Sequence, residues 1–143
     1  MLIGQYSSQI DHNDQFNIPA TFLNYFVSGA IATYGLDSNL FLFPSAYWEY
    51  LANEIIQLPL SSEAARSFRR FLFSNATNLT PDKKGRISLS PQLKRFAGVE
   101  QEIMIVGVHS YIEVWDMKAW ELERNKFIDS PLANKKGWEK IGI

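Results

Sequence analysis

The sequence contains no cysteine, and this absence excludes several kinds of chemistry. Disulfides, thiolate zinc sites, iron–sulfur clusters and thiol nucleophiles all need cysteine. Only two histidines are present, His12 and His109, and they do not stand at the spacing of metal ligands on a helix. We therefore expect no zinc site within one chain, and a reducing cytoplasm fits this composition.

Long apolar runs and an excess of charge of one sign are also missing. No stretch approaches the ~18 apolar residues of a membrane span, and the first five residues lack the basic region and apolar stretch of a secretory signal. We therefore expect no membrane partner. The 14 Lys and Arg residues are balanced by 15 Asp and Glu residues, which leaves a net charge of −1. A protein that binds polyanions through bulk charge would be basic, so binding to nucleic acid would need a local basic cluster multiplied by oligomerisation.

What the sequence does contain is enough apolar material for a folded domain. Of the 143 residues, 46% are apolar and 14% are aromatic. This length fits one domain, or two half-domains that share one core. The aromatic residues can supply both a core and an oligomer interface.

Motifs for catalysis or metal binding are not found. There is no Gly-rich phosphate or dinucleotide loop and no Gly-x-Ser-x-Gly nucleophile elbow. Residues 11–15 alternate oxygen-bearing side chains as a calcium loop does, but Phe16 stands where the sharp turn of that loop needs glycine. The cluster of Asp11, His12 and Asp14 is typical of a turn that hydrogen-bonds its own backbone. The sequence predicts no enzyme, no metal and no cofactor.

The most informative feature is an internal repeat. A shift of about 72 residues, half of the chain, aligns the apolar positions of the two halves and superposes five identical residues. The identical pairs are Pro19 with Pro91, Gly35 with Gly107, Ser38 with Ser110, Trp48 with Trp120, and Glu49 with Glu121. We infer a tandem duplication with halves at residues 1–71 and 72–143, the second of which includes the C-terminal tail.

Both halves predict the same order of elements. A strand, a polar turn and a short strand are followed by a helix that begins at proline and ends at Gly29 or Gly98, then by a hairpin and a second helix. The expected elements, first half and then second, are strands 3–10 and 76–80, turns 11–15 and 82–86, short strands 16–19 and 87–91, hairpins 31–43 and 103–115, and helices that begin at Pro19 and Pro91 and near Trp48 and Trp120.

Elements this short cannot close a core within one half. Two copies packed about a pseudo-two-fold axis can. The predicted fold is therefore α+β and β-rich, a tandem-duplicated small barrel of interleaved hairpins with peripheral helices and one shared core. A further helix at residues 61–73 is expected to break the symmetry of the repeat. Its arginines, Arg66, Arg69 and Arg70, form either a solvated face or a surface for phosphate or for acids of a neighbouring subunit.

The turn from Asp82 to Arg86 is the main candidate for a binding site. Gly85 supplies the positive φ that the turn needs. Asp82 can accept hydrogen bonds from the turn amides or hold the Arg86 guanidinium, so that Lys83, Lys84 and Arg86 project from a rigid loop. The alternative is an ordinary polar turn, but the duplication favours a function because it places a second loop at the equivalent position of the first half.

The pattern Asp-x-x-x-Arg, followed by a short alternating strand and Pro, resembles the MraZ family of bacterial regulators of the division and cell wall gene cluster. It occurs twice, about 70 residues apart, and the similarity covers nearly the whole chain. Residues 66–76 resemble the inter-repeat helix of the family, and residues 44–48 and 115–120 resemble its two helix starts. The family is similar to a duplicated AbrB-type swapped-hairpin domain. The resemblance implies a ring-like homo-oligomer in the cytoplasm and nucleoid that binds repeated short boxes in the promoter DNA of its own operon.

The two copies of the motif differ in one respect. The second is intact, whereas the first has Gln15 where the family has Arg, and Asp14 where the family usually has Gly. Gln15 can still hydrogen-bond a base edge or a phosphate, but Asp14 would repel phosphate. The expected DNA-binding residues are Arg86, Lys83, Lys84 and Gln15, and the residues expected to hold the loops are Asp82, Gly85 and Asp11.

Two functions therefore stay open. The first is a sequence-specific, DNA-binding transcriptional regulator. The second is an oligomeric structural or interaction protein with weakened or lost DNA binding, which Gln15, Asp14 and the net charge of −1 favour.

Overall fold

The structure is a computed structural model that describes the backbone of residues 1–143 and the side chains of all residues except 131–133. The strands are β1 (Leu2–Gln9), β2 (Gln15–Asn17), β3 (Ala30–Tyr34), β4 (Leu40–Pro44), β5 (Thr77–Leu79), β6 (Arg86–Ser88), β7 (Glu102–His109) and β8 (Tyr111–Asp116). The helices are α1 (Ala20–Leu23), the 3-10 turn η1 (Asn24–Phe26), α2 (Ser45–Ile56), α3 (Glu63–Ser74), α4 (Pro91–Ala97), α5 (Met117–Asp129) and α6 (Pro131–Lys140).

Six strands form one antiparallel sheet, in the order β1-β7-β8-β4-β3-β5. Strand β1 of the first half lies beside β7 of the second, and β5 of the second half lies beside β3 of the first. Strands β4 and β8 join the two halves in the middle of the sheet. The first strand of each half is therefore built onto the hairpin of the other half.

The predicted small barrel is wrong. Over the described residues the six-stranded sheet is open, with β1 and β5 at its edges. Strands β2 and β6 pair only with each other, in a separate two-stranded ribbon, and so do not extend the sheet toward closure. The α+β, strand-rich class is confirmed, but an open sheet and a ribbon take the place of the barrel.

Both halves contribute to one hydrophobic core. It is lined by the sheet, by the β2–β6 ribbon and by the short helices α1 and α4. At the centre of the ribbon, Phe16 pairs with Ile87, and these side chains are 2% and 1% exposed. Burying side chains of this size stabilises the fold by about 1.5–3 kcal/mol each. The ribbon, and with it the loops that precede its two strands, is thus anchored on the core.

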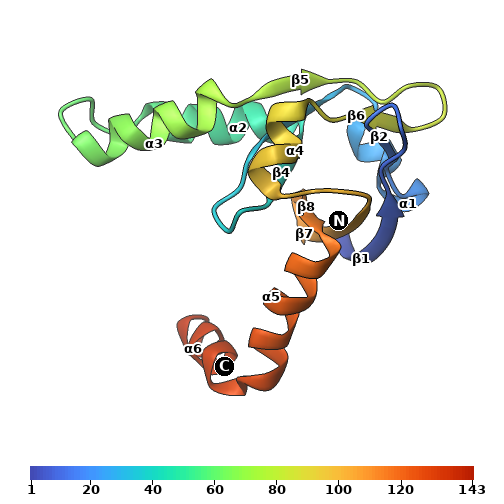
Figure 1. The fold of residues 1–143 in the computed structure, drawn as a ribbon. Coiled ribbons are helices and arrows are strands. Elements are labelled where there is room, and N and C mark those ends of the chain that lie inside the picture. Colours follow the sequence, from blue (N-terminus) through green and yellow to red (C-terminus); the bar gives the residue numbers. More distant parts are fainter.

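Two pairs of helices extend from this body (Figure 1). Helices α2 and α3 project together to one side. Helix α5 leads away from the sheet, and α6 turns back beside α5. The order of elements repeats here, because α6 follows α5 as α3 follows α2, whereas α3 contacts β3 and α6 contacts α5. That the helix at residues 61–73 breaks the symmetry of the repeat stays a prediction. Ser62 caps α3 by accepting the backbone N–H of Ala65 at 3.2 Å. Within the described residues, every helix is too short or too polar for a bilayer crossing.

Candidate nucleic-acid interface

The loop at residues 82–86 is closed by the carboxylate of Asp82. Its Oδ1 accepts the backbone N–H groups of Lys84 and Arg86, both at 2.9 Å. Two backbone bonds complete the turn, from the N–H of Gly85 to the carbonyl of Asp82 at 2.9 Å and from the N–H of Asp82 to the carbonyl of Arg86 at 3.0 Å. The backbone of this loop is therefore held at both ends and at its middle.

Glycine is favoured at position 85 of this loop for two reasons. Its φ is +75°, in the left-handed region that favours glycine. A Cβ at this position would also lie 3.2 and 3.3 Å from the two methyl carbons of Leu23. The predicted positive φ of Gly85 is confirmed, and the close approach of Leu23 adds a packing constraint that the turn pattern did not show.

Arg86 is oriented by the second oxygen of the same carboxylate. Its Nε donates to Asp82 Oδ2 at 2.7 Å, and both side chains are 35% exposed. The amide of Arg86 is the largest of the groups that lower the pKa of Asp82, so this carboxylate stays ionised at neutral pH. Lys83 and Lys84 are exposed beside it. Three basic residues against one acid give this loop a formal charge of +2.

The loop at residues 11–15 repeats this backbone geometry. Asp11 Oδ1 accepts the N–H groups of Asn13 at 2.8 Å and Gln15 at 3.0 Å. The N–H of Asp14 donates to the carbonyl of Asp11 at 3.1 Å, and Asp14 has a φ of +60° where the other loop has Gly85. The amide of Gln15 is the largest of the groups that lower the pKa of Asp11, and the charge of Arg86 lowers it further.

The two loops are tied together through the ribbon. The N–H of Ile18 donates to the carbonyl of Gly85 at 3.0 Å, and the N–H of Leu89 donates to the carbonyl of Asp14 at 2.9 Å. Each loop thus supports the strand that follows the other loop. The structure therefore brings both predicted loops to the β2–β6 ribbon. The loop at residues 82–86 is basic, and the loop at residues 11–15 is acidic.

Lys94 of α4 was missed in the sequence analysis. Its Nζ lies 2.6 Å from Asp14 Oδ1, so Asp14 is not the bare acid that the sequence predicted. Lys94 and Arg95 form the basic last turn of α4, which ends at Gly98 in the left-handed conformation. The sequence showed this basic turn before a terminating glycine, but it held no sign that the lysine reaches a loop 80 residues earlier.

Two of the three arginines of α3 have structural roles. Arg69 donates to the carbonyls of Ile55 at 3.3 Å and Ile56 at 2.6 Å at the end of α2, and also to the carbonyl of Leu58. Arg66 donates from Nη1 to the carbonyl of Leu60 at 2.8 Å. Arginine side chains often satisfy the last carbonyls of a helix in this way. Both therefore hold the turn between α2 and α3 together, which is neither of the two roles that the sequence suggested.

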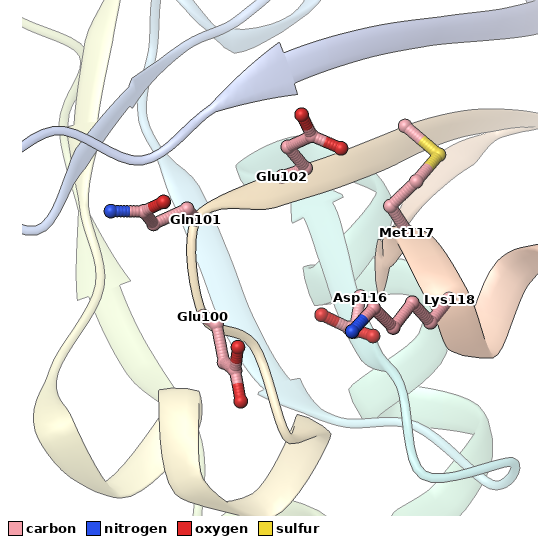
Figure 2. A pocket seen from close by; sticks show the side chains of 6 residues that line it. All are labelled: Glu100, Gln101, Glu102, Asp116, Met117 and Lys118. Carbon is pink, nitrogen blue, oxygen red and sulfur yellow. The ribbon is translucent and has the colours of Figure 1, made fainter.

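A pocket near the start of α5 has the opposite electrostatic character to the basic loop. It has a volume of about 230 Å³, and Figure 2 shows the side chains around it, which come from the start of β7 and from the junction of β8 and α5. Its lining residues are Glu100, Gln101, Glu102, Asp116, Met117 and Lys118. Three carboxylates against one ammonium group make this surface unsuited to phosphate. No cluster of three or more metal-ligating side chains occurs among the residues that the structure describes.

The fold and the paired loops define a class: a duplicated α+β domain whose halves exchange strands and carry one Asp-anchored loop each. A family model described as "MraZ protein, putative antitoxin-like" matches this chain twice, at residues 1–71 and 72–137. The chain belongs to the MraZ family, which is a family of transcriptional regulators and not of enzymes.

Three relatives, each named "Transcriptional regulator MraZ", illustrate the similarity. The protein of Thermomicrobium roseum is 40% identical over 120 residues, which are 84% of each chain. The protein of Herpetosiphon aurantiacus is 34% identical over 143 residues and the full length of both chains. The protein of Halothermothrix orenii is 38% identical over 120 residues, again 84% of each chain.

Proposed function

We propose that this protein regulates transcription by binding DNA through the loop at residues 82–86. The observation that carries the proposal is the rigid, exposed, basic geometry of this loop, in which Asp82 holds both the backbone and the Arg86 side chain. A preorganised cation loses little conformational entropy on binding. Asp82, Gly85 and Asp11 are proposed as the residues that hold the loops.

Each basic side chain has its own role in this proposal. Arg86 uses Nε for Asp82, which leaves its terminal nitrogens for a guanine edge or a phosphate. Lys83 and Lys84 provide electrostatic positioning on phosphates. Gln15 of the other loop adds a neutral hydrogen bond. Three phosphate contacts per protomer, each worth about 0.9 units of salt dependence, give a slope of about 2.7.

Binding of this strength by one protomer is weak, so we propose a ring-like homo-oligomer that engages repeated boxes. Linked contacts raise the effective concentration of the remaining loops without any new contact per protomer. Exposed apolar side chains on the helix pairs α2–α3 and α5–α6, and in the segments that join or follow these helices, support association between copies. They include Tyr50, Ile56, Leu60, Leu122, Trp138 and Ile141. We expect Leu122→Glu to lower the mass of the homo-oligomer in analytical ultracentrifugation. An unchanged mass would exclude the exposed face of α5 around Leu122 from the interface between protomers.

The proposed target is the promoter of the protein's own operon, within a division and cell wall gene cluster, and the proposed location is the cytoplasm and nucleoid. We also propose that residues 1–71 and 72–143 are structural halves related by a pseudo-two-fold axis. Reciprocal pairing supports this division, because β1 joins β7 while β5 joins β3.

A mobility-shift assay with the upstream DNA of the operon tests the function. We expect a shift that fades as salt rises and that is lost in Arg86→Ala. The matched control is Lys118→Ala, which removes one positive charge from the acidic pocket and should leave the shift intact. A shift that Arg86→Ala leaves unchanged would refute the proposed site.

The second candidate is an oligomeric interaction protein with weak or no DNA binding. The acidic loop at residues 11–15 and the net charge of −1 favour it. An intact oligomer that shifts no DNA at any concentration, or gives only a salt-insensitive shift, would establish this alternative.

A further inference from the structure

The ion pair between Lys94 and Asp14 joins α4 to the loop at residues 11–15. Nζ and Oδ1 are 2.6 Å apart, and the two side chains are 24% and 41% exposed. Asp14 occupies the left-handed position of its turn, so its side chain is directed by a backbone that Asp11 fixes. The pair links residues that are 80 positions apart.

The equivalent place in the basic loop has no charge on either side. There Gly85 faces the methyl groups of Leu23, which belongs to α1, the counterpart of α4. The fourth position of the first loop therefore holds an acid paired with a base of α4, whereas the fourth position of the second loop, Gly85, and the α1 residue that it faces are both uncharged. The positive charge of Lys94 thus offsets the negative charge of Asp14 at the first loop.

The charge count shows why compensation matters for a loop near DNA. Residues 11–15 hold two aspartates and no Lys or Arg, a formal charge of −2. Lys94 neutralises Asp14, and Asp11 is turned inward onto the amides of its own loop. Arg95 and Glu100 line the same surface pocket of about 350 Å³ and contribute opposite charges. Without Lys94, the carboxylate of Asp14 would be the unpaired charge at this site.

We propose that Lys94 is a positioning residue that masks the charge of Asp14, so that the first loop can lie against the DNA backbone while the second loop binds it. This proposal rests on the proposed function. Lys94 acts through Asp14 and is not itself a DNA contact. Each protomer then presents one basic loop and one masked loop, and DNA contact is unequal between the two halves.

A double-mutant cycle tests this role, with Lys94→Met, which keeps the aliphatic stem, and Asp14→Asn, which keeps a residue that tolerates positive φ. At about 0.1 M salt, one unmasked charge about 8 Å from a phosphate weakens binding about 1.5-fold per engaged protomer, and this factor multiplies over the protomers engaged. We expect this loss in Lys94→Met and its disappearance when Asp14→Asn is added. An equal loss in both backgrounds would show that Lys94 contacts phosphate directly, and no loss in either would show that the pair has no part in binding. Both results overturn the masking role.

Two further measurements separate this proposal from the proposed function. Thermal melting of each variant shows whether the fold is intact, and little change is expected because an exposed ion pair contributes little to stability. The cycle is also measured as the salt needed to elute the protein from heparin, a polyanion without base sequence. Coupling on heparin without any DNA shift would refute DNA binding, and with it the role of the pair at DNA, while still showing that Lys94 masks Asp14 toward a polyanion. A DNA shift that depends on Arg86, without coupling in either assay, would support DNA binding and refute masking.

Discussion

Restoring basic charge to the loop at residues 11–15 should convert it into a second DNA-binding loop. The change is Asp14→Gly combined with Gln15→Arg, which gives this loop the residue types at the matching positions of the other loop. The Asp11 carboxylate can hold the new arginine, since its Oδ1 accepts the hydrogen bonds of the loop and its Oδ2 accepts none from the described residues. In the other loop, Oδ2 of the equivalent Asp82 holds Arg86 at 2.7 Å.

The expected gain follows from the salt dependence of phosphate contacts. One added contact raises the slope of log affinity against log salt by about 0.9, which corresponds to about an eightfold gain in affinity at 0.1 M salt per engaged protomer. Asp14→Gly also relieves a non-glycine residue at a φ of +60° and frees Lys94 from its partner. We therefore expect the double variant to fold at least as stably as the parent protein.

Fluorescence anisotropy of a labelled upstream duplex, at several concentrations between about 50 and 200 mM salt, measures both the affinity and the slope. The matched control is Glu54→Gln with Gln57→Arg, which makes the same change of charge at exposed positions at the end of α2. The same gain in the control would mean that net charge alone drives binding. No gain in the loop variant would mean that this loop faces away from DNA.

Three further predictions concern stability. Ile87→Ala removes a side chain that is 1% exposed opposite Phe16 and should cost about 2–5 kcal/mol in chemical denaturation; a loss below about 1 kcal/mol would contradict the central position of the ribbon. The lowered pKa of Asp82 means that its contribution to stability is present above the usual value of 3.8 and is lost as pH falls through the folded-state pKa, so Asp82→Asn should flatten the acid limb of a melting curve recorded against pH. Burial raises the pKa of Glu113 above 4.5, although the indole N–H of Trp115 donates to its carboxylate at 2.8 Å. Ionisation of Glu113 therefore costs stability as pH rises through the folded-state pKa. We expect Glu113→Gln to raise the melting temperature at pH 7 but not at pH 4. Equal effects of Glu113→Gln at both pH values would exclude this cause.

Local patterns predicted the parts of the site that are made locally. The Asp-x-x-x-Arg spacing, with Gly85 before the arginine, was enough to predict a turn closed by Asp82, because all of its hydrogen bonds lie within five residues. The repeat then predicted a second such turn, although Asp14 replaces glycine there. Asp14 still adopts a positive φ, since short polar side chains tolerate that region.

Features that depend on distant contacts were not predictable in this way. Nothing near Lys94 indicates Asp14, and nothing near Arg69 indicates that it closes the end of α2. The barrel was wrong for the same reason. Whether two three-residue strands extend a sheet or pair with each other depends on how the halves pack, which hydrophobic periodicity does not encode.

Photo-crosslinking of the full oligomer to its upstream DNA tests the central claim most directly. A photoreactive side chain is placed at Lys84 in the basic loop, at Asn13 in the masked loop or at Lys118 in the acidic pocket. We expect strong crosslinks from position 84, weaker ones from position 13 and none from position 118. Bound DNA that crosslinks to position 118 but not to position 84 would contradict the claim that the loop at residues 82–86 is the DNA-binding surface.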